Sequence, residues 1–276
     1  PSWICLRDSV SGWPGTAPAA DVFSPLKSDT QLGKQGDDLY LLPTSQTLHA
    51  WGEQTLVRGR PVDLALDSTR RRLAVLNSRN VLLIDAVTGK QTGRIDTKST
   101  SYTGIAFRPG DRELWASETS RNGPDFILVA PLSAAGVAAR PQHIELRGHP
   151  VPAGMAFSPN GQTAYVALSR NNSLGVFDAE ARTLQREIPV GMAPFDVVLA
   201  GKAGRIFVSN RAGRRPVAGD TVAPSSGSEV VSDPLTGATS GGTVSVIDLP
   251  GMTVREIKVG LAPSKMALSP DEKTLA

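Results

Sequence analysis

A short apolar segment followed by a tight polar turn recurs along this chain and constrains its fold more than any other feature. The copies begin at Pro61, Tyr102, Pro152, Pro194 and Pro263, and they read PVDLALDSTRRRLAVLN, YTGIAFRPGDRELWASE, PAGMAFSPNGQTAYVAL, PFDVVLAGKAGRIFVSN and PSKMALSPDEKTLA. Their starts are separated by 41, 50, 42 and 69 residues. Self-similarity at such a period indicates one supersecondary unit that is stacked several times.

Each copy contains the parts of four consecutive strands. In the third copy, Met155–Phe157 is a short strand, Pro159-Asn160-Gly161 is a turn whose Asn-Gly pair accepts positive φ, and Ala164–Leu168 is a second strand. Third strands ending in an acidic residue are VLLIDA (81–86), LGVFDA (174–179) and VSVIDL (244–249), and fourth strands are QREIPVG (185–191) and VREIKVG (254–260). A period near forty residues with four strands predicts an all-β fold built from four-stranded antiparallel β-propeller blades.

The alternation within Val244-Ser245-Val246 places side chains on both faces of a blade. A single blade cannot bury both faces, so stacking around an axis is expected to supply the core. The acidic residues Asp85, Asp178 and Asp248 end equivalent strands. We interpret them as caps of their own turns rather than as catalytic carboxylates.

The composition supports an all-β chain and limits its partners. The 276 residues include 27 glycines and 21 prolines but only 5% aromatic residues, which is typical of short strands between many turns. A net charge of +3 does not indicate nucleic acid or an anionic membrane as a partner. The longest apolar stretch, 126–139, is too short to span a bilayer and is interrupted by Pro131.

Two segments carry a family resemblance. SPNGQTAYVALSRNNSLGVFDAEARTLQREIPVG (158–191) and GGTVSVIDLPGMTVREIKVGLAPSKMALSPDEKTL (241–275) resemble the YVTN-type, WD40-like propeller repeat of bacteria. The likeness covers about residues 39–276, and residues 102–148 form its most divergent copy. We therefore expect an N-terminal extension over 1–35 and propeller blades over 36–276.

The chain is expected to be an incomplete piece of a seven-bladed propeller, truncated at the C-terminus, because Ala276 falls within an expected second strand. The alternative is a five-bladed ring in which the two chain ends share one blade.

A long insert separates the second and third strands of the fourth copy. Val166 and Asp178 are 12 residues apart, whereas the equivalent Val208 and Asp248 are 40 apart, so the insert adds 28 residues. Its sequence, RAGRRPVAGDTVAPSSGSEVVSDPLTGATS (211–240), resembles the insert of proteins that join a YVTN propeller to a phosphoesterase domain. That resemblance implies a periplasmic or secreted bacterial protein whose phosphoesterase domain is absent from this chain.

The insert also contains the candidate binding residues. Arg211, Arg214 and Arg215 open it, and guanidinium groups suit phosphate or carboxylate ligands. Asp220 and Asp233 are secondary candidates. A loop between blade strands lies at one mouth of a propeller, and long loops in compact domains are frequently functional.

The sequence offers no catalytic or metal-binding set. His49, His143 and His149 are scattered without metal-ligand spacing, Cys5 has no evident base beside it, and neither a Gly-x-Ser-x-Gly elbow nor a P-loop occurs. We therefore predict a non-catalytic module, without a cofactor, that binds or positions a small molecule or partner for the phosphoesterase domain. The alternatives are a lactonase-like propeller hydrolase and a surface adhesion or assembly module.

Overall fold

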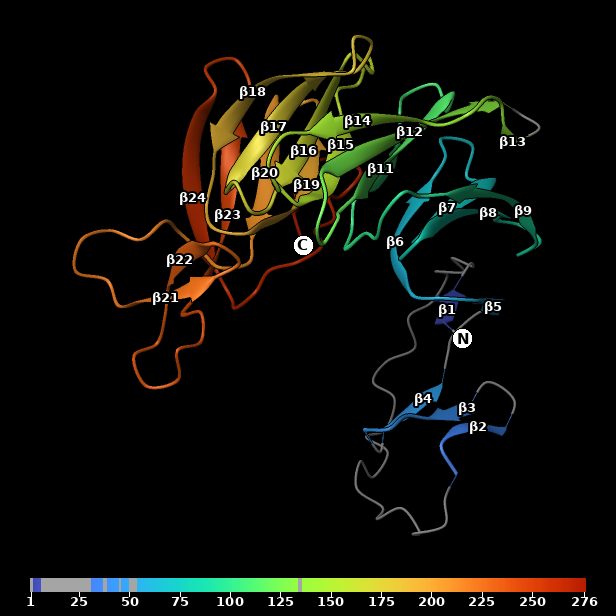
Figure 1. The fold of residues 1–276 in the computed structure, drawn as a ribbon, viewed down its shortest axis with the longest axis horizontal. Helices are drawn as coiled ribbons and strands as arrows, with labels where there is room; N and C mark the ends of the chain where they lie inside the picture. Colours follow the sequence, from blue (N-terminus) through green and yellow to red (C-terminus); the bar gives the residue numbers. More distant parts are fainter. Residues whose placement is uncertain (1, 6–30, 37–38, 45, 50–53, 134–135) are drawn as a thin grey trace. The chain divides into compact units, whose positions relative to one another are not determined.

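The computed structural model describes residues 2–5, 31–36, 39–44, 46–49, 54–133 and 136–276, and its regular elements are all β-strands (Figure 1). The chain divides into two compact units, one of residues 1–59 with 87–90 and the other of residues 60–86 with 91–276. No helix capable of crossing a membrane is found among the described residues.

The first unit contains two small antiparallel sheets. Its strands are β1 (Ser2–Cys5), β2 (Gly33–Gly36), β3 (Leu39–Leu41), β4 (Thr47–His49) and β5 (Gln54–Val57). β3 lies between β2 and β4, and β1 pairs with β5. The described strands between 36 and 59 thus pair within this unit, β3 with β2 and β4, and β5 with β1, and the assignment of 36–59 to the propeller stays a prediction.

The second unit contains the propeller blades, each an antiparallel sheet in chain order. Blade 1 is β6 (Pro61–Leu66), β7 (Arg72–Asn77), β8 (Asn80–Asp85) and β9 (Gln91–Asp96); blade 2 is β10 (Ile105–Phe107), β11 (Glu113–Glu118), β12 (Asp125–Ser133) and β14 (Gln142–Leu146), with β13 (Gly136–Val137) paired to the end of β12. Blade 3 is β15 (Pro152–Phe157), β16 (Thr163–Leu168), β17 (Ser173–Asp178) and β18 (Thr183–Pro189). The first strands β6, β10 and β15 are neighbours, so the first strand of each blade faces the propeller axis.

Blade 4 is β19 (Pro194–Ala200), β20 (Arg205–Asn210), β23 (Gly242–Asp248) and β24 (Thr253–Val259). β20 pairs directly with β23 although the insert separates them in sequence. The fifth copy, residues 263–276, forms a hairpin with a bridge between Leu268 and Leu275. The second unit thus has four complete blades and part of a fifth, which confirms the predicted β-propeller class.

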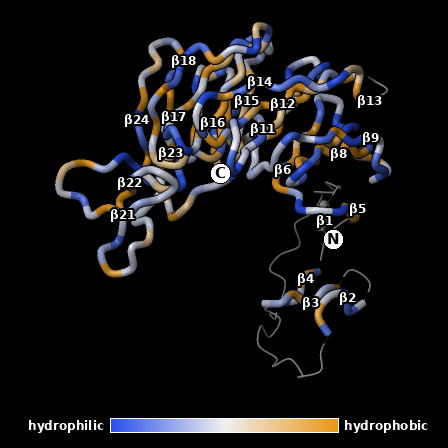
Figure 2. The backbone as a smooth tube through the Cα atoms, viewed as in Figure 1, coloured by the Kyte–Doolittle hydropathy of each residue, from blue (hydrophilic) through white to orange (hydrophobic). Residues whose placement is uncertain are grey.

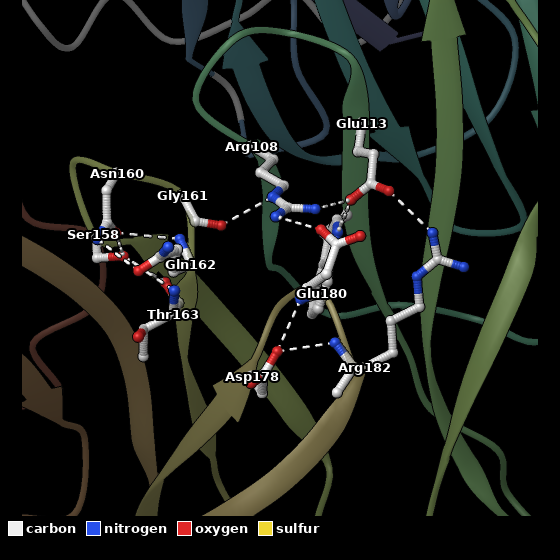
Figure 3. Close-up of polar contacts among 12 residues, drawn as sticks. Arg108, Glu113, Ser158, Asn160, Gly161, Gln162, Thr163, Asp178, Glu180 and Arg182 are labelled. Atoms are coloured by element: carbon white, nitrogen blue, oxygen red, sulfur yellow. Dashed lines mark hydrogen bonds and ion pairs between the residues drawn. The ribbon is translucent and has the colours of Figure 1, made fainter.

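The turns between first and second strands follow the predicted chemistry with one change. Gly161 takes the positive φ of 67°, and its N–H donates to the Ser158 carbonyl at 2.8 Å. Asn160 does not share the positive φ; its side-chain oxygen accepts the Gln162 N–H at 3.1 Å instead (Figure 3). Asp178 caps its own turn by accepting the N–H groups of residues 180 and 181, at 2.9 and 2.8 Å, so its predicted structural role is confirmed.

Apolar cores fill the spaces between successive blades. Ala116 and Leu128 of blade 2 pack against blade 1, whereas Trp115 and Ile127, one residue away on the same strands, pack against blade 3. A third core joins blades 3 and 4. Hydrophobic residues are concentrated along central strands such as β8, β12 and β16 (Figure 2). Alternation within each strand therefore buries both faces of a blade, as predicted.

A polar clamp adds to the contact between blades 2 and 3 (Figure 3). The Glu113 carboxylate pairs with Arg108 at 3.1 Å and with Arg182 at 2.9 Å. Arg108 also pairs with Glu180 at 2.9 Å and donates to the Gly161 carbonyl at 2.8 Å. Because Glu113, Arg108 and Arg182 are largely buried, their hydrogen bonds hold the two blades in one relative position.

Candidate functional site

The insert folds into a hairpin that extends from blade 4. β21 (Val222–Ser225) pairs with β22 (Ser228–Val231), and the turn between them is Ser226-Gly227. Both turn residues have positive φ, 49° at Ser226 and 87° at Gly227, as a two-residue hairpin turn of the favoured twist requires. The hairpin base is closed by the Ser232 N–H, which donates to the Thr221 carbonyl at 2.9 Å.

A cavity of about 490 Å³ lies at the mouth of the propeller, beneath this hairpin. Ala153 and Phe195 line it from first strands, and Arg170 and Arg211 line it from positions just after second strands. Ser225, Ser226 and Ser228 line it from the hairpin. Blades 3 and 4, the insert, Tyr102 before blade 2 and Ala262 before the fifth copy all contribute to the wall, so the cavity exists only in the assembled propeller.

The wall of this mouth cavity is cationic. Arg170 and Arg211 are its charged residues, and none of the described residues lining it is Asp, Glu, His or Cys. The Arg211 guanidinium lies 4.9 Å from the centre of the Phe195 ring, which orients it through a cation–π contact. Arg170 lies against the hairpin turn, where a Cβ placed on Gly227 would be 3.0 Å from its Nε.

Of the candidates predicted from the sequence, only Arg211 lines this cavity. Arg214 and Asp220 pair with each other in a two-pronged ion pair with N–O distances of 2.6 and 2.7 Å. The hydrogen bonds from Arg214 and from the Val217 N–H lower the pKa of Asp220 to about 2. This ion pair is internal to the insert and stabilises its first part.

The remaining two candidates also have partners within the protein. Arg215 donates from Nε to the Val190 carbonyl at 2.8 Å and from a terminal nitrogen to the Asn172 carbonyl, which anchors the insert to blade 3. Asp233 accepts hydrogen bonds from the Thr236 N–H at 2.9 Å, the Thr236 hydroxyl at 3.0 Å and the Leu235 N–H at 3.0 Å, and these bonds lower its pKa. It caps a turn at the distal part of the insert.

Arg170 and Asn172 were not predicted from the sequence. Both lie in the loop after the second strand of blade 3, where the corresponding loop of blade 4 begins with Arg211. The Asn172 side chain donates to Ser228 Oγ at 2.8 Å and accepts the Ala193 N–H at 2.8 Å, so it ties the hairpin to two blades. The sequence did contain a signal for both residues. The loops that follow the second strands of neighbouring repeats are equivalent, so they lie at the same end of a propeller.

A second polar cluster lies at the axis. The third residue of the repeat is Asp63, Gly104, Gly154, Asp196 or Lys265 in successive copies. The Lys265 ammonium lies 2.7 Å from Asp63 and 3.1 Å from Asp196, so it links the first and last copies. Burial alone would lower the pKa of Lys265, but the two carboxylates outweigh it and the pKa is raised. The ammonium therefore stays charged and neutralises two nearly buried acids.

Replacing Lys265 with methionine is expected to lower the free energy of unfolding by about 2 kcal/mol. The side chains of Asp63 and Asp196 are each 8% exposed and would lose their shared cation, whereas the 47% exposure of Lys265 lets water offset part of that loss. Urea unfolding at pH 7 measures the change. Lys273→Met, at an exposed site in the same copy, is the control, and equal losses in both variants would contradict this role.

The histidines do not form a metal site in the part of the chain that the structure describes. His143 Nε2 lies 3.4 Å from Glu118, and His149 Nδ1 lies 3.6 Å from Asp125. No group of three or more His, Cys, Asp or Glu side chains with metal-binding geometry occurs among the described residues.

Comparison with known proteins gives the fold. No family model matches the chain, and a search of curated proteins found no match. Among solved structures it is similar to Kuenenia stuttgartiensis hydrazine synthase, with a TM-score of 0.60 and 19% identity over 80% of this chain and 56% of that one. A functionally unknown protein from Desulfotomaculum acetoxidans gives a TM-score of 0.55 and 14% identity over 86% of this chain and 70% of that one.

The WD40 repeats of RRP9 are a third neighbour, with a TM-score of 0.54 and 12% identity over 77% of this chain and 56% of that one. The chain thus spans little more than half the length of the hydrazine synthase chain and of the RRP9 chain. At these identities the likeness concerns the fold alone. Together with the four complete blades, it shows that this chain has a β-propeller fold with WD40-like repeats.

Proposed function

We propose that this chain is a non-catalytic β-propeller module that binds a small ligand, or a group of a partner, in the mouth cavity beneath the insert hairpin. The observation that carries the proposal is the cavity itself. Its volume of about 490 Å³ lies within the range of ligand pockets, and blades and insert together form its wall. Loops at the end of a rigid scaffold are where binding residues concentrate.

The lining chemistry favours binding over catalysis. Acyl or phosphoryl transfer needs a general base or an activated nucleophile within hydrogen-bond reach of the substrate. The polar groups of the described lining are the hydroxyls of its serines, Thr239 and Tyr102, the Asn172 amide and two arginines, and it contains no imidazole, carboxylate or thiol that could activate a serine. This argues against the lactonase-like alternative at this site.

The finer proposal rests on the sequence resemblance. The repeat and the insert resemble those of bacterial proteins that join a YVTN propeller to a phosphoesterase domain. We propose that this module belongs to a larger exported protein of that kind and positions a substrate or partner for the phosphoesterase domain. Turnover of p-nitrophenyl phosphate or of a γ-lactone by this chain alone would contradict the non-catalytic role.

A panel of four compounds tests whether the mouth cavity binds a ligand. Phenyl phosphate, benzoate, benzylammonium and benzyl alcohol share one ring and differ in charge, and each is titrated into the chain by calorimetry. At least one is expected to bind saturably. Binding is expected to be lost when residues 222–231 are replaced by Gly-Gly, which removes the hairpin above the Thr221–Ser232 hydrogen bond. If no compound binds the intact chain, or if the shortened chain binds equally well, the proposal fails.

A further inference from the structure

We infer that the mouth cavity is a subsite for a phosphate monoester, held between Arg170 and Arg211; this inference rests on the proposed function. Its first support is the unused charge of the two guanidinium groups. Among the described residues neither forms an ion pair, whereas Arg108, Arg182, Arg205 and Arg214 all pair with carboxylates. Two cations therefore face a cavity whose described lining contains no anion.

The number of charges selects the ligand class. A phosphate monoester carries about −1.5 to −2 charges at pH 7 and three terminal acceptor oxygens. One such group neutralises both arginines, whereas a carboxylate carries a single charge and leaves one cation uncompensated. Guanidinium forks bind phosphate oxygens in pairs, and two forks from different blades can approach one phosphorus from two directions.

The hairpin supplies further donors. Ser228 Oγ accepts the Asn172 amide at 2.8 Å, which leaves its own hydrogen for a ligand oxygen. Ser225 and Ser226 also line the cavity with hydroxyl groups. Hydroxyls and guanidinium groups are donors toward phosphate. The Phe195 ring beside Arg211 offers an apolar surface to the organic part of the ester.

Gly227 leaves room for the Arg170 guanidinium beside the hairpin turn. It has a φ of 87°, and an added Cβ would lie 3.0 Å from Nε and 3.1 Å from a terminal nitrogen of Arg170. A larger residue would both strain the turn and displace the guanidinium.

The test titrates phenyl phosphate into the full chain by calorimetry at pH 8, where the ester is a dianion. Arg170→Ala and Arg211→Ala are each expected to weaken binding about tenfold or more, because charge-assisted hydrogen bonds are lost. Arg186→Ala, at an exposed site on β18 outside the cavity, is the matched control and is expected to bind like the parent protein. Both cavity arginines are exposed, so thermal unfolding should show all three variants folded.

Benzoate is expected to bind about tenfold more weakly than phenyl phosphate, and phenyl phosphate itself more weakly at pH 5, where it loses its second charge. If benzoate binds as tightly, or if the arginine variants do not weaken phenyl phosphate binding, the phosphate assignment is wrong. If benzylammonium or benzyl alcohol binds and phenyl phosphate does not, the proposal that the mouth cavity binds a ligand is supported and the phosphate assignment is wrong. If no panel compound binds, both proposals fall.

Discussion

Replacing Gly104 with alanine is expected to lower the free energy of unfolding by about 4 kcal/mol, the largest stability effect of any substitution considered. An added Cβ would lie 1.9 Å from the Ala153 carbonyl oxygen and 2.6 Å from its carbon, and these are backbone atoms of the next inner strand. Gly104 also has a φ of 102°, which alanine rarely adopts. Its N–H donates to Asp63 at 2.7 Å, so a shift of the backbone would also disturb the axial cluster.

The Gly110→Ala variant distinguishes the effect of the steric clash from the effect of the positive φ. Gly110 has a similar φ of 93°, but nothing lies within 4 Å of the position of its Cβ. The Gly110→Ala variant should therefore lose about 1 kcal/mol of stability, which is the cost of a positive φ at alanine. Urea unfolding of the parent and both variants measures the difference, and the melting temperature of Gly104→Ala should fall by roughly 10 °C. Equal losses at the two glycines would show that inner strands do not approach as closely as described.

Replacing Glu118 with glutamine is expected to remove a loss of stability that the parent protein suffers as the pH rises. The Glu118 side chain is fully buried; Oε1 accepts the Lys98 N–H at 3.1 Å, and Oε2 has no hydrogen-bond partner among the described residues. Burial raises its pKa from 4.5 to about 7, only partly offset by the Lys98 N–H and charge. The folded protein therefore binds the proton more tightly than the unfolded chain does.

The sign of the effect follows from that difference. Below pH 4.5 both states are protonated and no stability is lost, whereas between pH 4.5 and 7 the unfolded chain releases its proton first. The free energy of unfolding of the parent should thus fall by about 3 kcal/mol across this interval. Glutamine stays neutral, so the variant should match the parent near pH 5 and exceed its stability by about 2 kcal/mol at pH 8.

Urea unfolding at pH 5, 6, 7 and 8 measures both curves. Burial lowers the pKa of His143, which costs stability as the pH falls below 6.5. Because His143 Nε2 lies 3.4 Å from Glu118, the titrations of the two groups are coupled, so the comparison is repeated in a His143→Gln background, where only Glu118 differs. Glu145→Gln, at an exposed site on the neighbouring β14, is the control and should run parallel to the parent. Parallel curves for Glu118→Gln and the parent would show that Glu118 is ionised in the folded protein at all four pH values.

Patterns that act within one repeat were readable from the sequence. The alternation in 244–246 predicted a strand with two buried faces, the segment Pro159-Asn160-Gly161 predicted the turn closed by Gly161, and Asp178 was recognised as a cap. These features depend on neighbours a few residues away, and repetition of the unit multiplies the signal. The same reasoning assigned 36–59 to the propeller, which stays a prediction; in that range β3 pairs with β2 and β4, and β5 pairs with β1.

What the repeat could not reveal is how one copy meets another. Arg214 and Arg215 were predicted to bind a ligand. In the structure Arg214 pairs with Asp220, and Arg215 donates to the carbonyls of Asn172 and Val190. In the sequence Arg170 resembles any other loop residue, and only the fold brings the insert hairpin against it. The sequence by itself thus determined the blade, because strand alternation and turn chemistry are local. Only the tertiary structure decided which charges stay unpaired at the mouth, because their partners come from other blades.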